Sequence, residues 1–363
     1  MSWIGAFGRS RILEKTEVPG GHKIMTNPCR CPAVRLLGVV VLALALLFTA
    51  GYSCGVEPPG QEDPRSGKNK QPAQSATGNR VSVTLKLKIT AEPQTKLLVL
   101  DVQLPRSIPG RQKIIDIAYS TKPASVFEKN GQSYAQFLID QFPKDLVIAI
   151  DVNAEVYRYD YSIASHSEKG RQFEHKGSLA QWLIHEQYLD KYSPLVQAAA
   201  KGLSGKDEEE TLRKCFDFVR KTLTFGPYDP NDPDHGAEWA LQQRKGVCTE
   251  FADLFVALCR AEGIPARFCE GYLVGSPLVT PKHAHAWAEV YTQKYGWVPI
   301  DPSAYLGDVT KFAKMDPVYL LLNVERRNGV LPYGHIWAYC YTGGPVKDED
   351  EFRVNKLQKL QSK

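Results

Sequence analysis

The stretch of sequence that decides the fold is GVCTEFADLFVALCRAEGIPAR, residues 246–267. Apolar residues recur through its middle with helical spacing, and Gly263 and Pro265 mark the end of the helix. Cys248 therefore lies at or just inside the N-terminus of this helix. Unpaired N–H groups and the positive end of the helix dipole favour a thiolate at that position. Cys248 is thus a candidate nucleophile, and its own N–H is a candidate oxyanion donor.

A second motif, KHAHAWAEVY at residues 282–291, predicts a strand. Strict alternation puts His283, His285, Trp287 and Glu289 on one face of this strand. Three alanines lie between them on the opposite face. Side chains this small imply that another element packs closely there, and the helix described above is the candidate. Trp287 and Glu289 either support a site or simply pack.

The residues that follow, 293–302, read QKYGWVPIDP and predict a tight turn and a second strand. His285 and Asp301 are 16 residues apart, with Gln293 at their midpoint. A hairpin with an odd-length loop centred on Gln293 would place both side chains directly opposite each other on one face. An aspartate beside a histidine fixes the ring tautomer and stabilises the imidazolium. Nucleophile, base and orienting carboxylate thus occur in the order Cys248, His285, Asp301.

The run at 246–267, then Gly-Tyr, then HAWAEVY, then YGWVPIDP resembles the core of the transglutaminase-like superfamily. The resemblance is strong over about residues 195–305, and ERRNG further downstream resembles another family segment. It implies a papain-like fold in which Cys248 is the nucleophile, His285 the general base and Asp301 the orienting residue. It implies no metal and no organic cofactor.

Two details of this resemblance concern individual side chains. The H-x-W-x-E pattern selects His285 rather than His283 as the functional histidine. Phe225 stands where many relatives carry tyrosine, which leaves the side-chain donor to the oxyanion unassigned. The nearby candidates for that donor are Tyr228, Trp239 and Gln242.

The chemistry expected from these residues is cysteine-dependent acyl transfer on amide or peptide carbonyls through a thioester at Cys248. Water would resolve the thioester in a protease or amidase, and a lysine amine would resolve it in protein-glutamine cross-linking. The partner would be a protein or peptide substrate. The alternative is a catalytically silent, membrane-tethered binding or scaffold module that uses the same cleft.

Charge and cysteine content exclude other classes of protein. Residues 1–35 hold six basic and two acidic side chains, and the other 328 residues hold 39 basic against 38 acidic. A body so close to neutral argues against nucleic-acid binding. The eight cysteines form no CxxC pair, which argues against structural zinc. Four of them are predicted to be small core hydrophobes, although an exported protein could pair two of them: Cys215, Cys259, Cys269 and Cys340.

The N-terminal part predicts export. Residues 36–56 carry no charge, and the basic Arg30 and Arg35 precede them, as in a signal peptide or membrane anchor spanning residues 1–54. The anchor is either a lipid on Cys54 or an uncleaved helix, and the chain starts at Met1 or Met25. Residues 55–80 are rich in Pro, Gly, Ser and Gln and predict a disordered linker. The folded part is therefore expected outside the cytoplasm and held at the membrane.

The rest of the chain predicts an α+β protein, in which an all-β, immunoglobulin-like sandwich precedes the papain-like, transglutaminase-like core. Short strands expected between residues 81 and 165 form the sandwich, read as a spacer or docking domain. They span residues 81–89, 97–104, 114–119, 134–139 and 146–157. The catalytic domain is expected at residues 178–345, its sheet completed by strands at 318–324 and 336–341. A charged, frayed tail is expected at residues 346–363. The sequence leaves the oligomeric state open.

Overall fold

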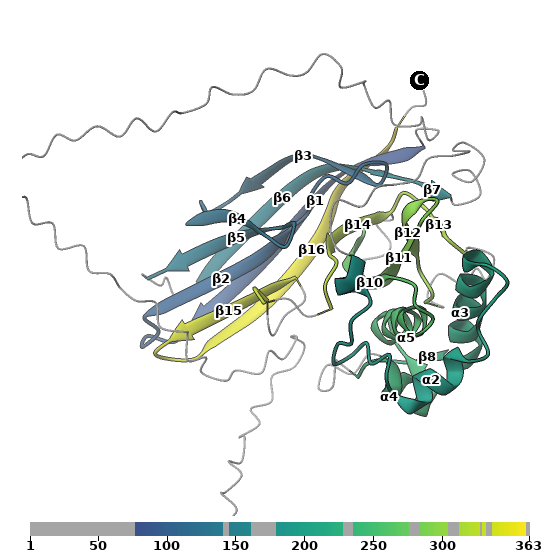
Figure 1. Cartoon of the computed structure of the whole chain (residues 1–363). Coiled ribbons are helices and arrows are strands. Elements are labelled where there is room, and N and C mark those ends of the chain that lie inside the picture. The colour runs from purple at the N-terminus through teal and green to yellow at the C-terminus, as the bar shows by residue number, and fades with distance from the viewer. Residues whose placement is uncertain are drawn as a thin grey trace, which may run out of the picture.

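The computed structural model describes residues 77–140, 145–160, 179–227, 235–275, 284–303, 312–326, 329–331 and 336–360. A β-sandwich and a mixed α/β core lie side by side in it (Figure 1). The apolar segment at 36–56, Cys54 and the linker lie outside the described residues, so their predictions stay predictions. Among the residues that are described, no helix is long and apolar enough to cross a membrane.

Two antiparallel four-stranded sheets form the sandwich. The first has the order β16-β1-β6-β3, with β1 at Gly78–Ala91, β3 at Gln112–Tyr119, β6 at Asp145–Tyr157 and β16 at Val346–Lys359. The second has the order β15-β2-β5-β4, with β2 at Leu97–Leu104, β4 at Ser125–Lys129, β5 at Gln132–Ile139 and β15 at Trp337–Thr342. Alternate residues of β1 are buried between the sheets, because a strand points successive side chains to opposite faces. These are Val81, Val83, Leu85, Leu87 and Ile89.

The hairpin that joins β4 to β5 depends on Asn130 and Gly131. Their φ angles are 53° and 69°, so both lie in the left-handed region that a two-residue primed turn requires. Asn-Gly is the sequence that such a turn favours. The short strand β4 before it was not expected, since its Ser125–Lys129 sequence is half polar and largely exposed.

The prediction of a frayed tail at residues 346–363 was wrong. Of these residues, Val346–Lys359 form β16, which pairs with β1 from Asn79↔Lys359 to Ala91↔Val346. The charges occupy mainly the solvent face, whereas Val346 and Phe352 are buried. A strand with one wet face tolerates charge at alternate positions, and this makes it resemble a polar tail in sequence.

The strand expected at residues 336–341 also lies elsewhere than predicted. It is β15, and it pairs with β2 of the sandwich rather than with the core sheet. Both ends of the described chain therefore build the sandwich, and the core is inserted between them. The boundary drawn between a sandwich at 81–165 and a catalytic domain at 178–345 does not hold at its C-terminal side.

The core consists of a four-stranded sheet and a group of helices. The sheet has the order β12-β11-β10-β14, with β10 at Ala266–Leu273, β11 at His285–Thr292, β12 at Gly296–Ile300 and β14 at Tyr319–Asn323. The helices are η1 (Leu179–Trp182), α2 (Pro194–Ala200), α3 (Glu208–Thr222), α4 (Ala237–Gln243) and α5 (Cys248–Ala261). Two short pairs complete it: β7 (Tyr159–Asp160) with β13 (Lys314–Met315), and β8 (Thr224–Phe225) with β9 (Lys245–Gly246).

Helix α5 is the centre of the core. It packs against β10 and β11 on one side and against α2, α3 and α4 on the other. Its residues from 250 to 260 are all buried, which explains a sequence that is apolar on almost every face. By contrast α3 is amphipathic, and the Asp207 side chain caps it by accepting from the Glu210 N–H at 2.8 Å.

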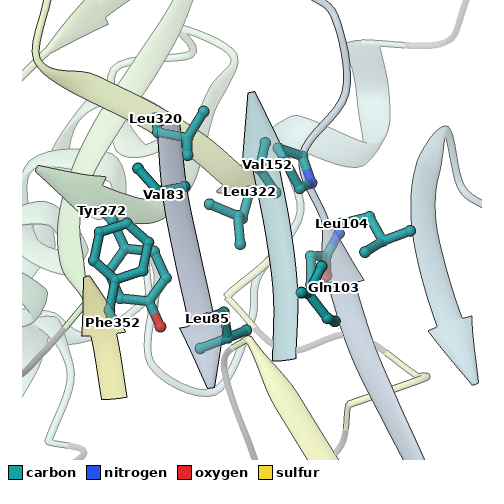
Figure 2. A pocket seen from close by; sticks show the side chains of 11 residues that line it. Val83, Leu85, Gln103, Leu104, Val152, Tyr272, Leu320, Leu322 and Phe352 are labelled. Atoms are coloured by element: carbon teal, nitrogen blue, oxygen red, sulfur yellow. The ribbon is translucent and has the colours of Figure 1, made fainter. Parts of the chain in front are cut away.

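The sandwich and the core share one interior. Tyr272 and Val274 from the β10 end, together with Leu320 and Leu322 of β14, pack among the buried residues of the sandwich. The Tyr272 ring stacks on Phe352 of β16, with the centroids 3.7 Å apart. Figure 2 shows Tyr272, Leu320, Leu322 and Phe352 lining the pocket between the two parts. The sandwich therefore supports the core sheet directly.

Candidate active site

The local sequence sets Cys248 at the first position of α5. Val247 precedes the helix, and its N–H donates to the Glu250 carboxylate at 2.9 Å, which caps the helix end. A Cβ atom at Gly246 would lie 2.4 Å from the Glu250 Cβ, so only glycine fits there. Cys248 is a free thiol and is half-buried. Its N–H belongs to the first turn, where N–H groups have no partner inside the helix.

His285 and Asp301 are in direct contact. The His285 Nε2 and Asp301 Oδ2 atoms are 2.8 Å apart, and each side chain is 7% exposed. The second carboxylate oxygen, Oδ1, accepts from the Ser303 N–H at 2.9 Å. His285 is the first residue of β11, and Asp301 follows the last residue of β12. The expectation that one face of the hairpin carries both side chains is met.

The expected register of that hairpin was wrong by one position. Thr292 pairs with Gly296, so the loop is centred on Lys294 rather than on Gln293. Extending this register puts Asp301 opposite Trp287, diagonal to His285 and not directly across from it. The reason is Gly296, whose φ of 66° lies in the left-handed region and closes the loop one residue later than the midpoint predicts.

Cys248 belongs to this group, because its thiol lies close enough to the His285 imidazole to contribute to the pKa of the ring. Since Nε2 faces Asp301, Nδ1 is the ring nitrogen left for the sulfur. Burial lowers the pKa of His285, but the charge and hydrogen bond of Asp301 and the hydrogen bond of Cys248 outweigh it and raise this pKa to about 10. Burial raises the pKa of Asp301, and the His285 charge overcomes this, so the pKa falls below its ordinary value. These directions favour an imidazolium beside an ionised carboxylate.

Tyr319 belongs to the same group and was missed by the sequence analysis. Its hydroxyl donates to Asp301 Oδ2 at 2.9 Å. Its ring centroid lies 5.9 Å from that of His285 and 5.3 Å from that of Trp287. Local sequence carries no signal for this role, since Tyr319 begins an ordinary apolar strand.

Trp287 and Glu289 share the strand face of His285 but differ in what they contact. The Trp287 ring lies beside the imidazole, with centroids 6.2 Å apart. Glu289 instead pairs with Arg267 of β10 at 2.5 Å and with Arg111 of the sandwich at 2.6 Å. Glu289 therefore ties the core to the sandwich and does not touch Cys248, His285 or Asp301 in the contacts of the described residues. His283 lies outside the described residues.

The side-chain donor to the oxyanion stays unassigned. Tyr228 lies outside the described residues. The Trp239 ring stacks on His235, with centroids 3.7 Å apart, and Gln242 is exposed on α4. The Cys248 N–H therefore remains the candidate donor for which the helix geometry gives a reason.

The other described cysteines have structural surroundings. Cys215, Cys259 and Cys269 are free and fully buried in the core, as predicted. Cys340 was also predicted to be a core hydrophobe, but it is only half-buried, on β15. Within the described ranges, no group of three or more His, Cys, Asp or Glu side chains is arranged to hold a metal ion.

Comparison with known proteins bears on this geometry. Residues 197–302 match the family model of the transglutaminase-like superfamily. This part of the chain is a transglutaminase-like domain. A structure from Cytophaga hutchinsonii, solved as a candidate cysteine protease, is 16% identical and aligns with a TM-score of 0.57 over 80% of this chain and 93% of that one. The likeness extends over most of the chain, so the predicted fold class, a transglutaminase-like core with a β-rich region, is confirmed.

Curated relatives match over shorter stretches. The uncharacterized protein YebA of Bacillus subtilis is 32% identical over 113 residues, which are 28% of this chain and 15% of that protein. A protein-glutamine gamma-glutamyltransferase of Pseudomonas aeruginosa is 34% identical over 87 residues, or 21% of this chain and 13% of that protein. The match thus spans less than a sixth of either relative.

Proposed function

We propose that this protein carries out cysteine-dependent acyl transfer on amide or peptide carbonyls. The observation that carries the proposal is that the His285 imidazole bonds to Asp301 and lies close enough to Cys248, at the start of a buried helix, for the thiol to affect its pKa. A helix N-terminus and an adjacent imidazolium are the surroundings that activate a thiol as a nucleophile.

In the first half-reaction the Cys248 sulfur bonds to the carbonyl carbon, and the oxygen takes the negative charge opposite the Cys248 N–H. The C–N bond then breaks, and the His285 imidazolium gives its proton to the departing amine. A thioester remains on Cys248, and His285 is left neutral. Asp301 keeps the ring oriented and stabilises its charged form throughout.

In the second half-reaction water or an amine attacks the thioester carbonyl. His285 takes a proton from the attacking group, the C–S bond breaks and the thiolate–imidazolium pair is restored. The transglutaminase-like domain supports both acceptors, since the named relatives include a glutamyltransferase and a candidate cysteine protease. The substrate is a protein or peptide that presents a carboxamide or peptide bond.

The test compares the full chain with Cys248→Ala and His285→Gln variants. The assays are release of amine from fluorogenic peptide amides and incorporation of a biotinylated amine into a glutamine-containing protein. We expect both variants to lose turnover by at least about a thousandfold, as when a triad member is removed. Cys340→Ser is the matched control, since Cys340 is also half-buried but lies on β15 of the sandwich. Equal turnover in wild type and Cys248→Ala would favour a silent binding module.

We also propose that the protein works outside the cytoplasm, held at the membrane by its N-terminal segment. The supporting observation is the uncharged run at residues 36–56 behind Arg30 and Arg35. Mass spectrometry of the mature N-terminus separates the two anchors, because lipidation leaves a modified Cys54 as the first residue. A Cys54→Ala variant would then stay unprocessed. An unmodified N-terminus upstream of residue 36 would instead favour an uncleaved helix.

A further inference from the structure

Asp301 has more hydrogen-bond partners than it would need to orient His285. Its Oδ2 atom contacts both His285 Nε2 at 2.8 Å and the Tyr319 hydroxyl at 2.9 Å. Its Oδ1 atom accepts from the Ser303 N–H at 2.9 Å. Of these three partners, Tyr319 and Ser303 take no part in the reaction. Tyr319 differs from Ser303 because it comes from a distant strand, so its position depends on tertiary structure.

Strand β14 brings Tyr319 to the site through a close approach to β10. A Cβ atom at Gly271 would lie 2.0 Å from the Leu320 carbonyl oxygen, so the two backbones meet at a distance that only glycine allows. Gly271 pairs with His285 on one side and with Leu321 on the other. The close approach therefore occurs at the level of the imidazole, two residues from Tyr319.

The sandwich holds β14 in this place from the other side. The buried Gln112 side chain of β3 accepts from the Leu321 N–H at 2.8 Å and donates to the Leu321 carbonyl at 2.9 Å. The side chains of Leu320 and Leu322, on either side of Leu321, point into the apolar pocket of the sandwich (Figure 2). Sliding β14 by one residue would break both Gln112 bonds and withdraw both leucines from the pocket.

We propose that Tyr319 is a positioning residue of the acyl-transfer site, which holds Asp301 toward His285, and that the sandwich sets its position through β14. The inference rests on the function proposed above. It gives the sandwich a part in the site, in place of the spacer or docking role expected from the sequence.

The proposal has a consequence for the pH dependence of the site. A hydroxyl that donates to a carboxylate stabilises its ionised form, so loss of the Tyr319 hydroxyl makes Asp301 protonate at higher pH. A neutral Asp301 would leave the imidazolium buried without its countercharge, and the thiolate–imidazolium pair would then collapse. Four ionisable groups besides Asp301 lie at the site: Cys248 from α5, His285 from β11, Tyr319 from β14 and Asp316, which precedes β14. In addition, the Arg220 guanidinium of α3 donates to the Ser303 carbonyl.

The experiment measures the rate at which iodoacetamide alkylates Cys248 in the full chain from about pH 2 to about pH 8, on either side of the ordinary carboxyl pKa of about 4. Alkylation is followed at the Cys248 peptide by mass spectrometry. The acid edge of the profile is the pH below which the alkylation rate falls. In Tyr319→Phe we expect this edge to move to higher pH by about one unit, the size expected for one lost bond to a charged group. The matched control is Tyr341→Phe, which removes a hydroxyl from β15 and should leave the edge unmoved.

A second variant tests the part played by the sandwich. Gln112→Met keeps the length of the side chain but cannot bond to Leu321, so we expect the acid edge to rise here too, by less than in Tyr319→Phe. The control is Gln136→Met on β5, which removes a side-chain bond to Asp101 Oδ1. If Tyr319→Phe fails to fold, Gln112→Met carries the test.

The outcomes separate this inference from the proposed function. If the wild-type thiol is activated and Tyr319→Phe has the same acid edge, the positioning role is overturned and the acyl-transfer proposal stays intact. An unmoved edge in Gln112→Met overturns the part assigned to the sandwich. A wild-type profile of an ordinary thiol overturns both proposals, because no activated pair would then exist.

Discussion

Replacing Glu289 with glutamine should destabilise the whole described fold. The Glu289 side chain is 2% exposed and lies between Arg267, at 2.5 Å and 2.9 Å, and Arg111, at 2.6 Å. The two arginines come from the core and from the sandwich, and their side chains are 10% and 17% exposed. Glutamine keeps the shape but leaves both guanidinium groups buried without a negative charge.

The expected size follows from measurements on other buried ion pairs. Removing one partner from such a pair costs about 3–5 kcal/mol, because the remaining charge stays desolvated. At about 2 °C for each kcal/mol in a chain of this size, Glu289→Gln should lower the unfolding temperature by about 6–10 °C. Glu351→Gln is the matched control: Glu351 is 45% exposed beside Arg353, and its loss should cost less than about 1 kcal/mol.

The pKa of Glu289 determines how the stability that this residue contributes changes with pH. Burial raises the pKa of Glu289, but Arg267 and Arg111 outweigh it and hold this pKa below its ordinary value. The ionised pair therefore contributes its full stability above the unfolded pKa of about 4.3, and this stability is lost as pH falls through the lower folded pKa. Thermal unfolding followed by circular dichroism should show the largest difference between wild type and variant near neutral pH. Equal unfolding temperatures at about pH 7 would refute the reasoning, since they would mean that the charge of Glu289 contributes no net stability.

Two further predictions concern β14 and β16. Gly271→Ala should destabilise the fold by about 1–3 kcal/mol in chemical denaturation, because its Cβ would meet the Leu320 carbonyl, whereas Gly202→Ala, with nothing within 4 Å of its Cβ, should cost far less. Similar losses in both variants would contradict this. Ending the chain at Gly344 should leave β1 an open edge and give insoluble or unfolded protein, measured by the soluble fraction and circular dichroism. A soluble, folded product with an unchanged unfolding temperature would mean that β16 is dispensable.

Sequence was sufficient for the features that depend on short-range pattern. The apolar helix after Cys248 was predicted from its composition and its closing Gly263, and the structure has it at Cys248–Ala261. His285 and Asp301 were placed on one face because strand alternation preserves parity across a hairpin. An error of one residue in the loop centre moved Asp301 from directly opposite to diagonal, and a flexible carboxylate still reaches the ring at 2.8 Å. Face parity survived the error because both alternatives leave the same residues on the same side.

Sequence was not sufficient where a role depends on a distant partner. Tyr319 reads as the first residue of an apolar strand, and only the fold shows that its hydroxyl meets Asp301. The charges of β16 suit a solvated tail and a one-sided strand equally well, and the deciding partner is β1, more than 250 residues earlier. The Arg111 side chain likewise meets Glu289 at a sequence separation of 178. Local pattern carries no information on such pairings.

The insertion of the core into the sandwich makes the site depend on the last strand of the chain. β16 pairs with β1 from Ala91↔Val346 onward, so the first sheet stays open at this edge until the C-terminal residues are present. Phe352 of that strand covers Tyr272 and lines the pocket that receives Leu320 and Leu322. Without Phe352, the pocket that fixes the register of β14 loses one of its lining side chains. Tyr319 is then no longer held at a fixed distance from Asp301. The triad motifs are complete by residue 301, yet the strand that holds their carboxylate is supported by residues some 50 positions further along the chain.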